Sequence, residues 1–249
     1  MKLFNLTGFT KFGIFLLILL NISCITCSYT SSGYDGRMIN KYSFAFIRAT
    51  GEKPALCHPL DTKCLETPVV YTGSGVVLYK DIDNKSTFVA TAKHICKSEL
   101  TVEGSPIVFQ IKDFDGNKYF GAPVFLHKTQ DFCIIKIVDD KNILQPAIIS
   151  SNPPVYGERV YVMSAPKGIY DINMVPIFEG LYSGNSSDAI TEHSIFTVPA
   201  TFGSSGSPVF NSKGELVGII HSVIEKFFHI SLTVPWSTLD QINPDIYDN

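Results

Sequence analysis

Hydrophobic positions along this chain come in short runs that polar turn residues separate. The runs are rich in Val, Ile, Phe, Tyr and Thr, which favour strands, and turns such as DFDGNK (113–118) and NSKGE (211–215) lie between them. Helical periodicity is almost absent. Twelve runs are expected to form strands: 42–49, 69–79, 86–92, 106–112, 122–127, 132–138, 159–165, 175–183, 194–200, 207–211, 216–224 and 227–234.

The number of expected strands indicates the architecture. About a dozen strands over roughly 210 residues are too many for one small sandwich and suit two β-barrels packed together. We therefore expect an all-β fold of two packed six-stranded antiparallel barrels, formed by about 42–145 and 146–249. The tail STLDQI (237–242) predicts a short C-terminal helix.

The first 28 residues are typical of a secretory signal sequence. Lys2 and Lys11 precede an uncharged run from Phe12 to Cys27, which ends in small residues. This run has 16 residues, whereas a membrane-spanning helix needs roughly 20. A retained membrane anchor is the alternative, and a lipid-modified Cys24 is a third interpretation that Asn21 disfavours. Residues 29–41 are expected to be a Ser/Gly-rich spacer before a folded domain over 42–249.

Composition and charge narrow the function classes. The chain has 249 residues, of which 45% are hydrophobic and 17% charged, and its net charge is −3. This composition is ordinary for a globular domain with enough apolar side chains for a core. Because there is no large basic excess, we expect no nucleic-acid partner.

The cysteines are compatible with export. Beyond the leader four remain, and an even number in an exported domain permits disulfides. Cys57 and Cys64 flank a short loop that a bridge could close. Cys96 and Cys133 lie in apolar runs, where buried free thiols are the favoured interpretation. These cysteines and the histidines show no metal-ligand spacing, so no metal is expected. No organic cofactor is expected either, because the acyl-transfer chemistry considered below requires none.

Three stretches carry residues suited to acyl transfer. STFVATAKHICKS contains His94, KTQDFCIIKI contains Asp131, and TFGSSGSPVFN contains Ser205. A serine hydroxyl is a poor nucleophile until an imidazole accepts its proton, and a carboxylate holds that imidazole in the correct tautomer. Each residue alone has an ordinary structural interpretation, but their joint occurrence favours a catalytic triad.

Glycines distinguish Ser205 from its neighbours in GSSGSP (203–208). A nucleophilic serine must lie where two backbone N–H groups converge on the developing oxyanion. Gly203 precedes Ser205 by two residues and Gly206 follows it, and both can adopt dihedrals that side chains forbid. We therefore expect Ser205 to be the nucleophile and the amides of Gly203 and Ser205 to form the oxyanion hole.

With these motifs the sequence resembles the trypsin-like (chymotrypsin-fold) serine peptidases, and within them the bacterial HtrA-like proteases and glutamyl endopeptidases. The resemblance covers about Tyr42 to Ile242. It rests on several stretches in the family's order: GSGVVLY followed by TAKHIC, DFCIIKI, GERVYVMSAPKG, FEGLYSG, GSSGSPVFNSKGELVGI and HISLTVPWSTL. It implies a chymotrypsin-like double barrel and a Ser-His-Asp triad. Ser204 replaces the family's usual Asp or Asn before the nucleophile, which removes the acidic partner of a new N-terminal amine. The resemblance therefore implies an enzyme that is active without propeptide cleavage.

The resemblance also implies where a substrate side chain binds. Pro199, Ala200 and Thr201 precede the nucleophile and are expected to form the pocket floor, which without Asp or Glu selects an uncharged, small-to-medium apolar P1 residue. His221 is a further substrate-binding candidate, because a histidine on the equivalent strand lines this pocket in glutamyl endopeptidases. Here it follows Gly218 by three residues rather than two. Strand alternation therefore turns it to the other face, which the resemblance places near Asp131 rather than in the pocket, unless a bulge reverses this.

Together these features predict an exported serine endopeptidase that acts on proteins or peptides. Attachment to a membrane through the N-terminal apolar segment is compatible with this prediction. The alternative from another class is a protease-fold binding module that has lost catalysis. A third interpretation keeps the chemistry but restricts it to one dedicated protein substrate.

Overall fold

The computed structural model describes residues 39–242, apart from 53, 59, 140, 188–190 and 225. The predicted signal sequence and residues 29–38 of the predicted spacer lie outside the described residues. Ile39, which we placed in the spacer, is 6% exposed and packs into the hydrophobic core.

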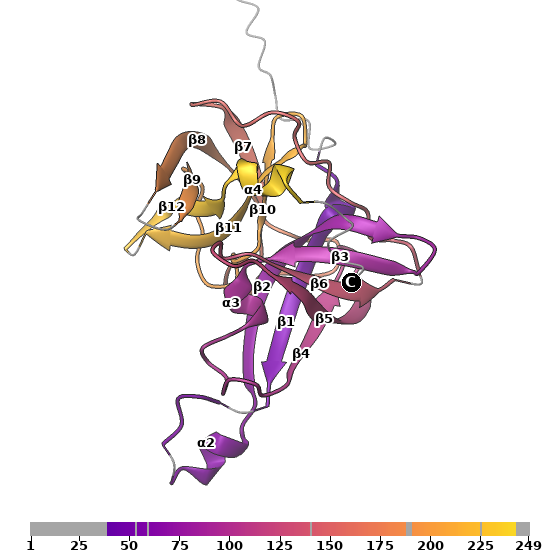
Figure 1. The fold of residues 1–249 in the computed structure, drawn as a ribbon, viewed down its shortest axis with the longest axis vertical. Helices are drawn as coiled ribbons and strands as arrows, with labels where there is room; N and C mark the ends of the chain where they lie inside the picture. Colours follow the sequence, from indigo (N-terminus) through magenta and orange to yellow (C-terminus); the bar gives the residue numbers. More distant parts are fainter. Residues whose placement is uncertain are drawn as a thin grey trace, which may run out of the picture. The chain divides into compact units, whose positions relative to one another are not determined.

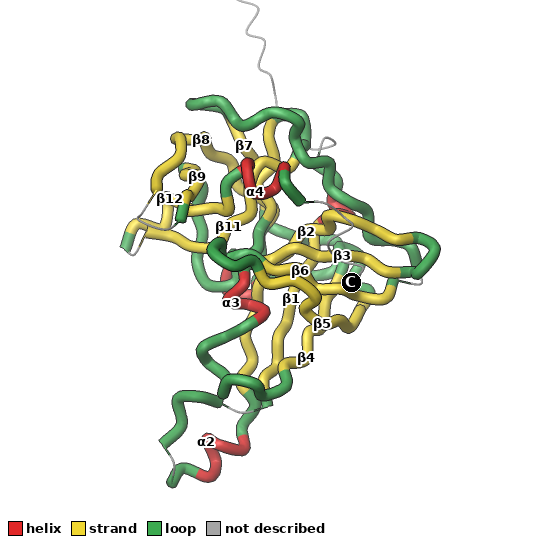
Figure 2. Tube along the Cα trace, viewed as in Figure 1, coloured by secondary structure: helices red, strands yellow, loops and turns green. Residues whose placement is uncertain are grey.

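Twelve antiparallel strands form two closed six-stranded barrels (Figures 1 and 2). Each strand overlaps one of the twelve predicted runs, so the predicted all-β double-barrel fold is confirmed. The first barrel has the order β1-β2-β3-β6-β5-β4 and the second β10-β11-β12-β9-β8-β7. The strands are β1 (Phe44–Gly51), β2 (Val69–Asp81), β3 (Ser86–Thr91), β4 (Ile107–Lys112), β5 (Lys118–Leu126), β6 (Cys133–Val138), β7 (Arg159–Met163), β8 (Ile177–Ser187), β9 (Glu192–Phe196), β10 (Pro208–Asn211), β11 (Leu216–Ile224) and β12 (Phe227–Val234).

A hydrophobic cluster contains residues of both barrels, and β3 contributes one of its faces to this cluster. All six residues of β3 are buried. Val89 points into the core of the first barrel, whereas Phe88 packs into a cluster that also contains Met163 and Phe210 of the second barrel. Because successive strand residues face opposite sides, β3 is covered on both faces. The chain therefore enters the following helix from a well-anchored strand.

Helices are few and short among the described residues (Figure 2). The predicted C-terminal helix is α4, and none of the described helices is long and apolar enough to cross a bilayer. A segment carrying α2 projects from the ends of β1 and β2 (Figure 1). The helices are α2 (Thr62–Glu66), α3 (Lys93–Cys96) and α4 (Trp236–Asp240), with 3-10 turns η1 (Lys41–Ser43) and η2 (Pro166–Gly168).

Two disulfides are present among residues 39–242, and one corrects the sequence interpretation. Cys57 is bridged to Cys64, which lies within α2. Cys96 and Cys133 are buried as expected, but they are bridged, so their interpretation as free thiols is wrong. The reason is strand pairing, because Thr91 of β3 lies opposite Cys133 of β6. The turn of α3 after β3 then brings the Cα atoms of Cys96 and Cys133 to 6.6 Å, within the usual range for a disulfide.

Candidate active site

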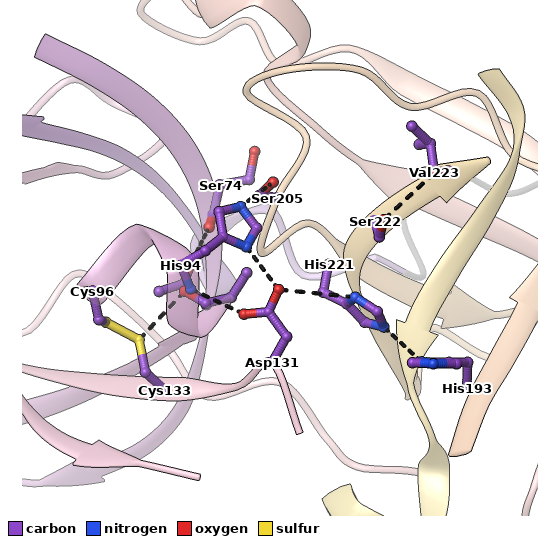
Figure 3. A network of polar contacts seen from close by, with 12 residues as sticks. Ser74, His94, Cys96, Asp131, Cys133, His193, Ser205, His221, Ser222 and Val223 are labelled. Carbon is purple, nitrogen blue, oxygen red and sulfur yellow. Dashed lines mark hydrogen bonds and ion pairs between the residues drawn. A yellow bond between two sulfur atoms is a disulfide. The ribbon is translucent and has the colours of Figure 1, made fainter. Parts of the chain in front are cut away.

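The structure brings His94, Asp131 and Ser205 together where the two barrels meet (Figure 3). His94 lies on α3, Asp131 precedes β6, and Ser205 lies in the loop between β9 and β10. His94 Nδ1 is 2.7 Å from Asp131 Oδ2, and His94 Nε2 is 2.8 Å from Ser205 Oγ. With Nδ1 donating to the carboxylate, Nε2 is left to accept the serine proton.

Asp131 holds His94 at two points. Its Oδ1 accepts the backbone N–H of His94 at 3.0 Å, while Oδ2 contacts the imidazole. Burial tends to raise the pKa of the Asp131 carboxyl, but the hydrogen bonds from His94 and the electrostatic interactions with His94 and His221 outweigh it, so this pKa lies below its ordinary value. The carboxylate is therefore charged at neutral pH and can stabilise an imidazolium.

The loop around Ser205 depends on its two glycines. Gly203 has a φ of +90° and Gly206 of +88°. A Cβ on Gly203 would overlap the Ala165 carbonyl oxygen, and one on Gly206 would overlap that of Ser74. Only glycine combines this backbone region with such close approach, so the residues that predicted the nucleophile also shape its loop.

Ser74 on β2 anchors this loop from the first barrel, a role that the sequence analysis missed. Its N–H donates to the Ser205 carbonyl at 2.7 Å. Its hydroxyl donates to the Gly203 carbonyl at 3.0 Å and accepts from the Ala165 N–H at 3.1 Å. In the sequence, Ser74 lies in a Gly-Ser-Gly stretch that we used only as a family motif. Its role as an anchor could not be predicted from this stretch, because its hydrogen-bond partners are more than ninety residues away.

The amides of Gly203 and Ser205 donate to no acceptor among the described residues. The Phe202 carbonyl accepts from the Lys167 N–H at 2.6 Å. Because the C=O and N–H of a trans peptide point in opposite directions, the Gly203 N–H points away from Lys167. Both amides are therefore available to an added oxygen, as an oxyanion hole requires.

A cleft of about 1710 Å³ runs past His94, Asp131 and Ser205. Ala200 and Thr201 line it, whereas Pro199 is not among the residues that line it. On the second-barrel side, the cleft is lined by Lys167, Ala200, Thr201, Phe202, Gly203, Ser204, Ser205, Ile220, His221, Ser222, Val223 and Phe228, a set without Asp or Glu.

His221 borders this cleft, but its ring is directed elsewhere. Its Nδ1 lies 3.9 Å from Asp131 Oδ2, and its Nε2 lies 3.1 Å from His193 Nδ1 (Figure 3). The pairing of β11 with β12 shifts register between Ile220 and Ser222. Despite this irregularity, His221 faces Asp131, the side that strand alternation indicated.

The Cys96–Cys133 disulfide ties together the two segments that carry His94 and Asp131, because each cysteine follows one of these residues by two positions. We predict that the double variant Cys96→Ala/Cys133→Ala loses about 2–5 kcal/mol of unfolding free energy. Its kcat should also fall about tenfold, because small misplacements of catalytic groups cost up to about 100-fold. Denaturant unfolding and peptide hydrolysis measure the two effects.

The matched control is Cys57→Ala/Cys64→Ala, which removes the disulfide of the α2 segment. Neither Cys57 nor Cys64 lines the cleft. This variant should lose stability while retaining kcat. Equal kcat losses in both double variants would contradict a specific effect of the Cys96–Cys133 bridge on the site.

Comparison with known proteins agrees with this fold. The model of the trypsin-like peptidase domain matches residues 73–219, more than half of the chain, whereas a search of curated proteins finds no match. The fold is similar to that of a variant of the HtrA-type protease AlgW with decapeptide, at a TM-score of 0.64 and 15% identity over 82% of this chain and 63% of that one. It is also similar to AlgW with decapeptide, at 0.60 and 17% over 80% and 62%. This chain thus spans less than two thirds of those proteins, and it belongs to the family of trypsin-like peptidase domains.

Proposed function

We propose that this protein is a serine endopeptidase. The observation that carries the proposal is the continuous series of contacts from Ser205 Oγ through His94 to Asp131, at 2.8 and 2.7 Å. His94 Nε2 takes the hydroxyl proton as Ser205 Oγ bonds to the peptide carbonyl carbon, and Asp131 stabilises the imidazolium that forms. His94 then gives this proton to the leaving amine, and a water molecule hydrolyses the acyl-enzyme by the same route.

The Gly203 and Ser205 amides would stabilise the oxyanion of each tetrahedral intermediate. Their freedom from other acceptors among the described residues supports this role. No step requires a metal or organic cofactor, because the three side chains and two amides supply the nucleophile, the base and the oxyanion donors.

Proteins or peptides are the proposed substrates. The cleft of about 1710 Å³ exceeds the roughly 300–1,000 Å³ usual for a small-molecule site. Ala200, Thr201 and Phe228 line the second-barrel side of the cleft, and the absence of an acidic residue among the residues that line this side supports an uncharged P1 side chain. HtrA-type AlgW structures contain a decapeptide or a tripeptide, and peptide binding in this chain is proposed by that similarity.

A fluorophosphonate probe tests the proposal because it reacts with an activated serine hydroxyl. Native protein should acquire one adduct, which mass spectrometry of its peptides should place on Ser205. Heat-denatured protein is the control and should stay unlabelled, because activation depends on the folded triad. If native protein stays unlabelled, the alternative of an inactive protease-fold binding module is favoured.

Export stays a prediction from residues 1–28. Disulfides persist mainly in oxidising compartments, so the Cys57–Cys64 and Cys96–Cys133 bridges support it. Determining the N-terminus of the mature protein would distinguish a removed leader from a retained anchor.

A further inference from the structure

Two histidines extend the polar series beyond Asp131. His221 on β11 places Nδ1 3.9 Å from Asp131 Oδ2, the oxygen that also contacts His94 Nδ1. His193 on β9 places its Nδ1 3.1 Å from His221 Nε2. Figure 3 shows Asp131 between the rings of His94 and His221, with His193 behind His221. The described contacts therefore run from Ser205 through His94, Asp131 and His221 to His193.

His221 is neutral at physiological pH. Its side chain is 7% exposed. Burial is the main cause that lowers the pKa of the His221 imidazole to about 4; Asp131 acts in the opposite direction, and His193 and His94 contribute to the lowering. Among the described residues, these three side chains are the titratable groups that act on it, from β9, α3 and the loop before β6. A neutral imidazole carries one N–H, so the position of that proton matters.

The two neighbours of His221 select one tautomer. With the proton on Nδ1, the N–H dipole points toward the negative Asp131 carboxylate, and Nε2 accepts a hydrogen bond from His193 Nδ1–H. The other tautomer would turn a lone pair toward the carboxylate, which is electrostatically unfavourable. At 3.9 Å the contact with Asp131 is a charge–dipole interaction rather than a hydrogen bond. The Asp131 carboxylate therefore favours the proton on His221 Nδ1, and His193 supports this tautomer when its Nδ1–H donates to His221 Nε2.

β11 holds both this imidazole and the nucleophile loop. The Ile220 carbonyl accepts the Gly206 N–H at 2.6 Å. The next residue is His221, which faces Asp131. Ile220 thus helps to position the loop that carries Ser205, and the next residue, His221, contacts the Asp131 carboxylate. In this way one strand of the second barrel contacts a side chain from the first barrel.

We propose that His221 is a positioning residue for peptide hydrolysis, with His193 holding its Nδ1–H toward Asp131. This rests on the proposed peptidase function. Asp131 receives both of its hydrogen bonds from His94. The dipole of His221 is a further favourable interaction on the opposite side, which keeps the carboxylate in the orientation that His94 needs.

Loss of the His221 dipole and a general disruption of the site should change the pH dependence of kcat/KM in opposite directions. The positive end of the His221 N–H dipole faces the Asp131–His94 pair. Removing it leaves more negative potential at His94, which favours the imidazolium form. The acidic limb of the pH profile of kcat/KM then moves to higher pH. Displacement of Asp131 by misfolding would instead weaken the imidazolium and move this limb to lower pH.

The test compares His221→Phe, His221→Gln and His193→Phe in the full chain, using a peptide anilide with valine before the scissile bond. For His221→Phe we expect kcat to fall about tenfold, KM to stay within about twofold, and the acidic limb to move up; a 1 Å misplacement would cost up to about 100-fold. His221→Gln, whose amide can donate N–H, should recover part of kcat. His193→Phe should lower kcat less.

Coupling between the variants tests the direction of the effect. Because His193 acts through His221, the double variant His221→Phe/His193→Phe should be no slower than His221→Phe alone. His229→Gln is the matched control, since His229 is exposed on β12 and does not line the cleft. Additive losses, or a kcat of His221→Phe equal to wild type, would overturn the inference.

A spectroscopic measurement decides the matter even if the variants fold poorly. In the folded wild-type chain at neutral pH, nitrogen chemical shifts should show His221 protonated at Nδ1 and unprotonated at Nε2. The opposite tautomer would overturn the inference. Failure of the proposed function is a separate result, because wild-type protein would then neither hydrolyse the anilide nor react with a fluorophosphonate.

Discussion

Replacing Ser205 with alanine should lower kcat for peptide hydrolysis about a million-fold. Removing the nucleophile of a triad has an effect of this size, because the imidazole and carboxylate then have no hydroxyl to activate. The fold should be unaffected, since the hydrogen bond that Ser205 Oγ forms among the described residues is the one with the His94 imidazole. Hydrolysis of a casein panel measures the loss, with wild-type and variant purified identically to exclude contaminating protease.

The neighbouring serine Ser207 provides a matched control. Its hydroxyl is buried and has no hydrogen-bond partner among the described residues, so Ser207→Ala should retain activity. His94→Ala should cost nearly as much as Ser205→Ala, and the double variant should add little, because the residues act as one unit. Undiminished hydrolysis by Ser205→Ala would exclude this serine as the nucleophile.

Asp131→Asn should lower kcat about ten-thousand-fold while KM changes little. The asparagine amide can donate to His94 Nδ1, which places the ring proton on Nε2, where it cannot accept from Ser205 Oγ. The negative charge that stabilises the imidazolium is also lost. Steady-state hydrolysis of a peptide anilide measures the effect, and Asp83→Asn, on an exposed turn, should leave kcat unchanged.

The same variant should show a pH-dependent change in stability. The folded-state pKa of Asp131 is lower than that of an ordinary aspartate, which is about 3.9. Its ionisation therefore stabilises the fold fully above that pH, and this contribution is lost as the pH falls through the lower folded-state pKa. The stability difference between wild type and Asp131→Asn should shrink in acid. A difference that grew on acidification would contradict the assigned carboxylate environment.

The twelve strands were predictable because each depends on local information. In β6 the pattern Cys-Ile-Ile-Lys-Ile-Val combines β-branched side chains with turn residues before it, and such features persist whatever the strand pairs with. His94, Asp131 and Ser205 could be proposed because each lies in a short motif. That the three side chains meet depends on barrel closure, which brings loops from both halves to one seam.

Long-range pairing accounts for what sequence reasoning missed. Cys96 and Cys133 have the burial that apolar runs indicate, but only the pairing of β3 with β6 brings them within bonding distance. Pro199 lies next to Ala200 in the chain, yet it is absent from the cleft lining. The partner of His221 was likewise hidden, because His193 comes from another strand and is paired with it only in the closed barrel.

The amino-acid sequence by itself determined the strand pattern, the double-barrel class and the three residue types of the candidate triad, because side-chain periodicity and glycine placement act over a few residues. Only the tertiary structure decided the Cys96–Cys133 bridge, the anchoring of the nucleophile loop by Ser74 and the two histidines behind Asp131. Each of these contacts joins residues at least 28 positions apart in the sequence. Their proximity is set by strand register and barrel closure, which no local pattern encodes.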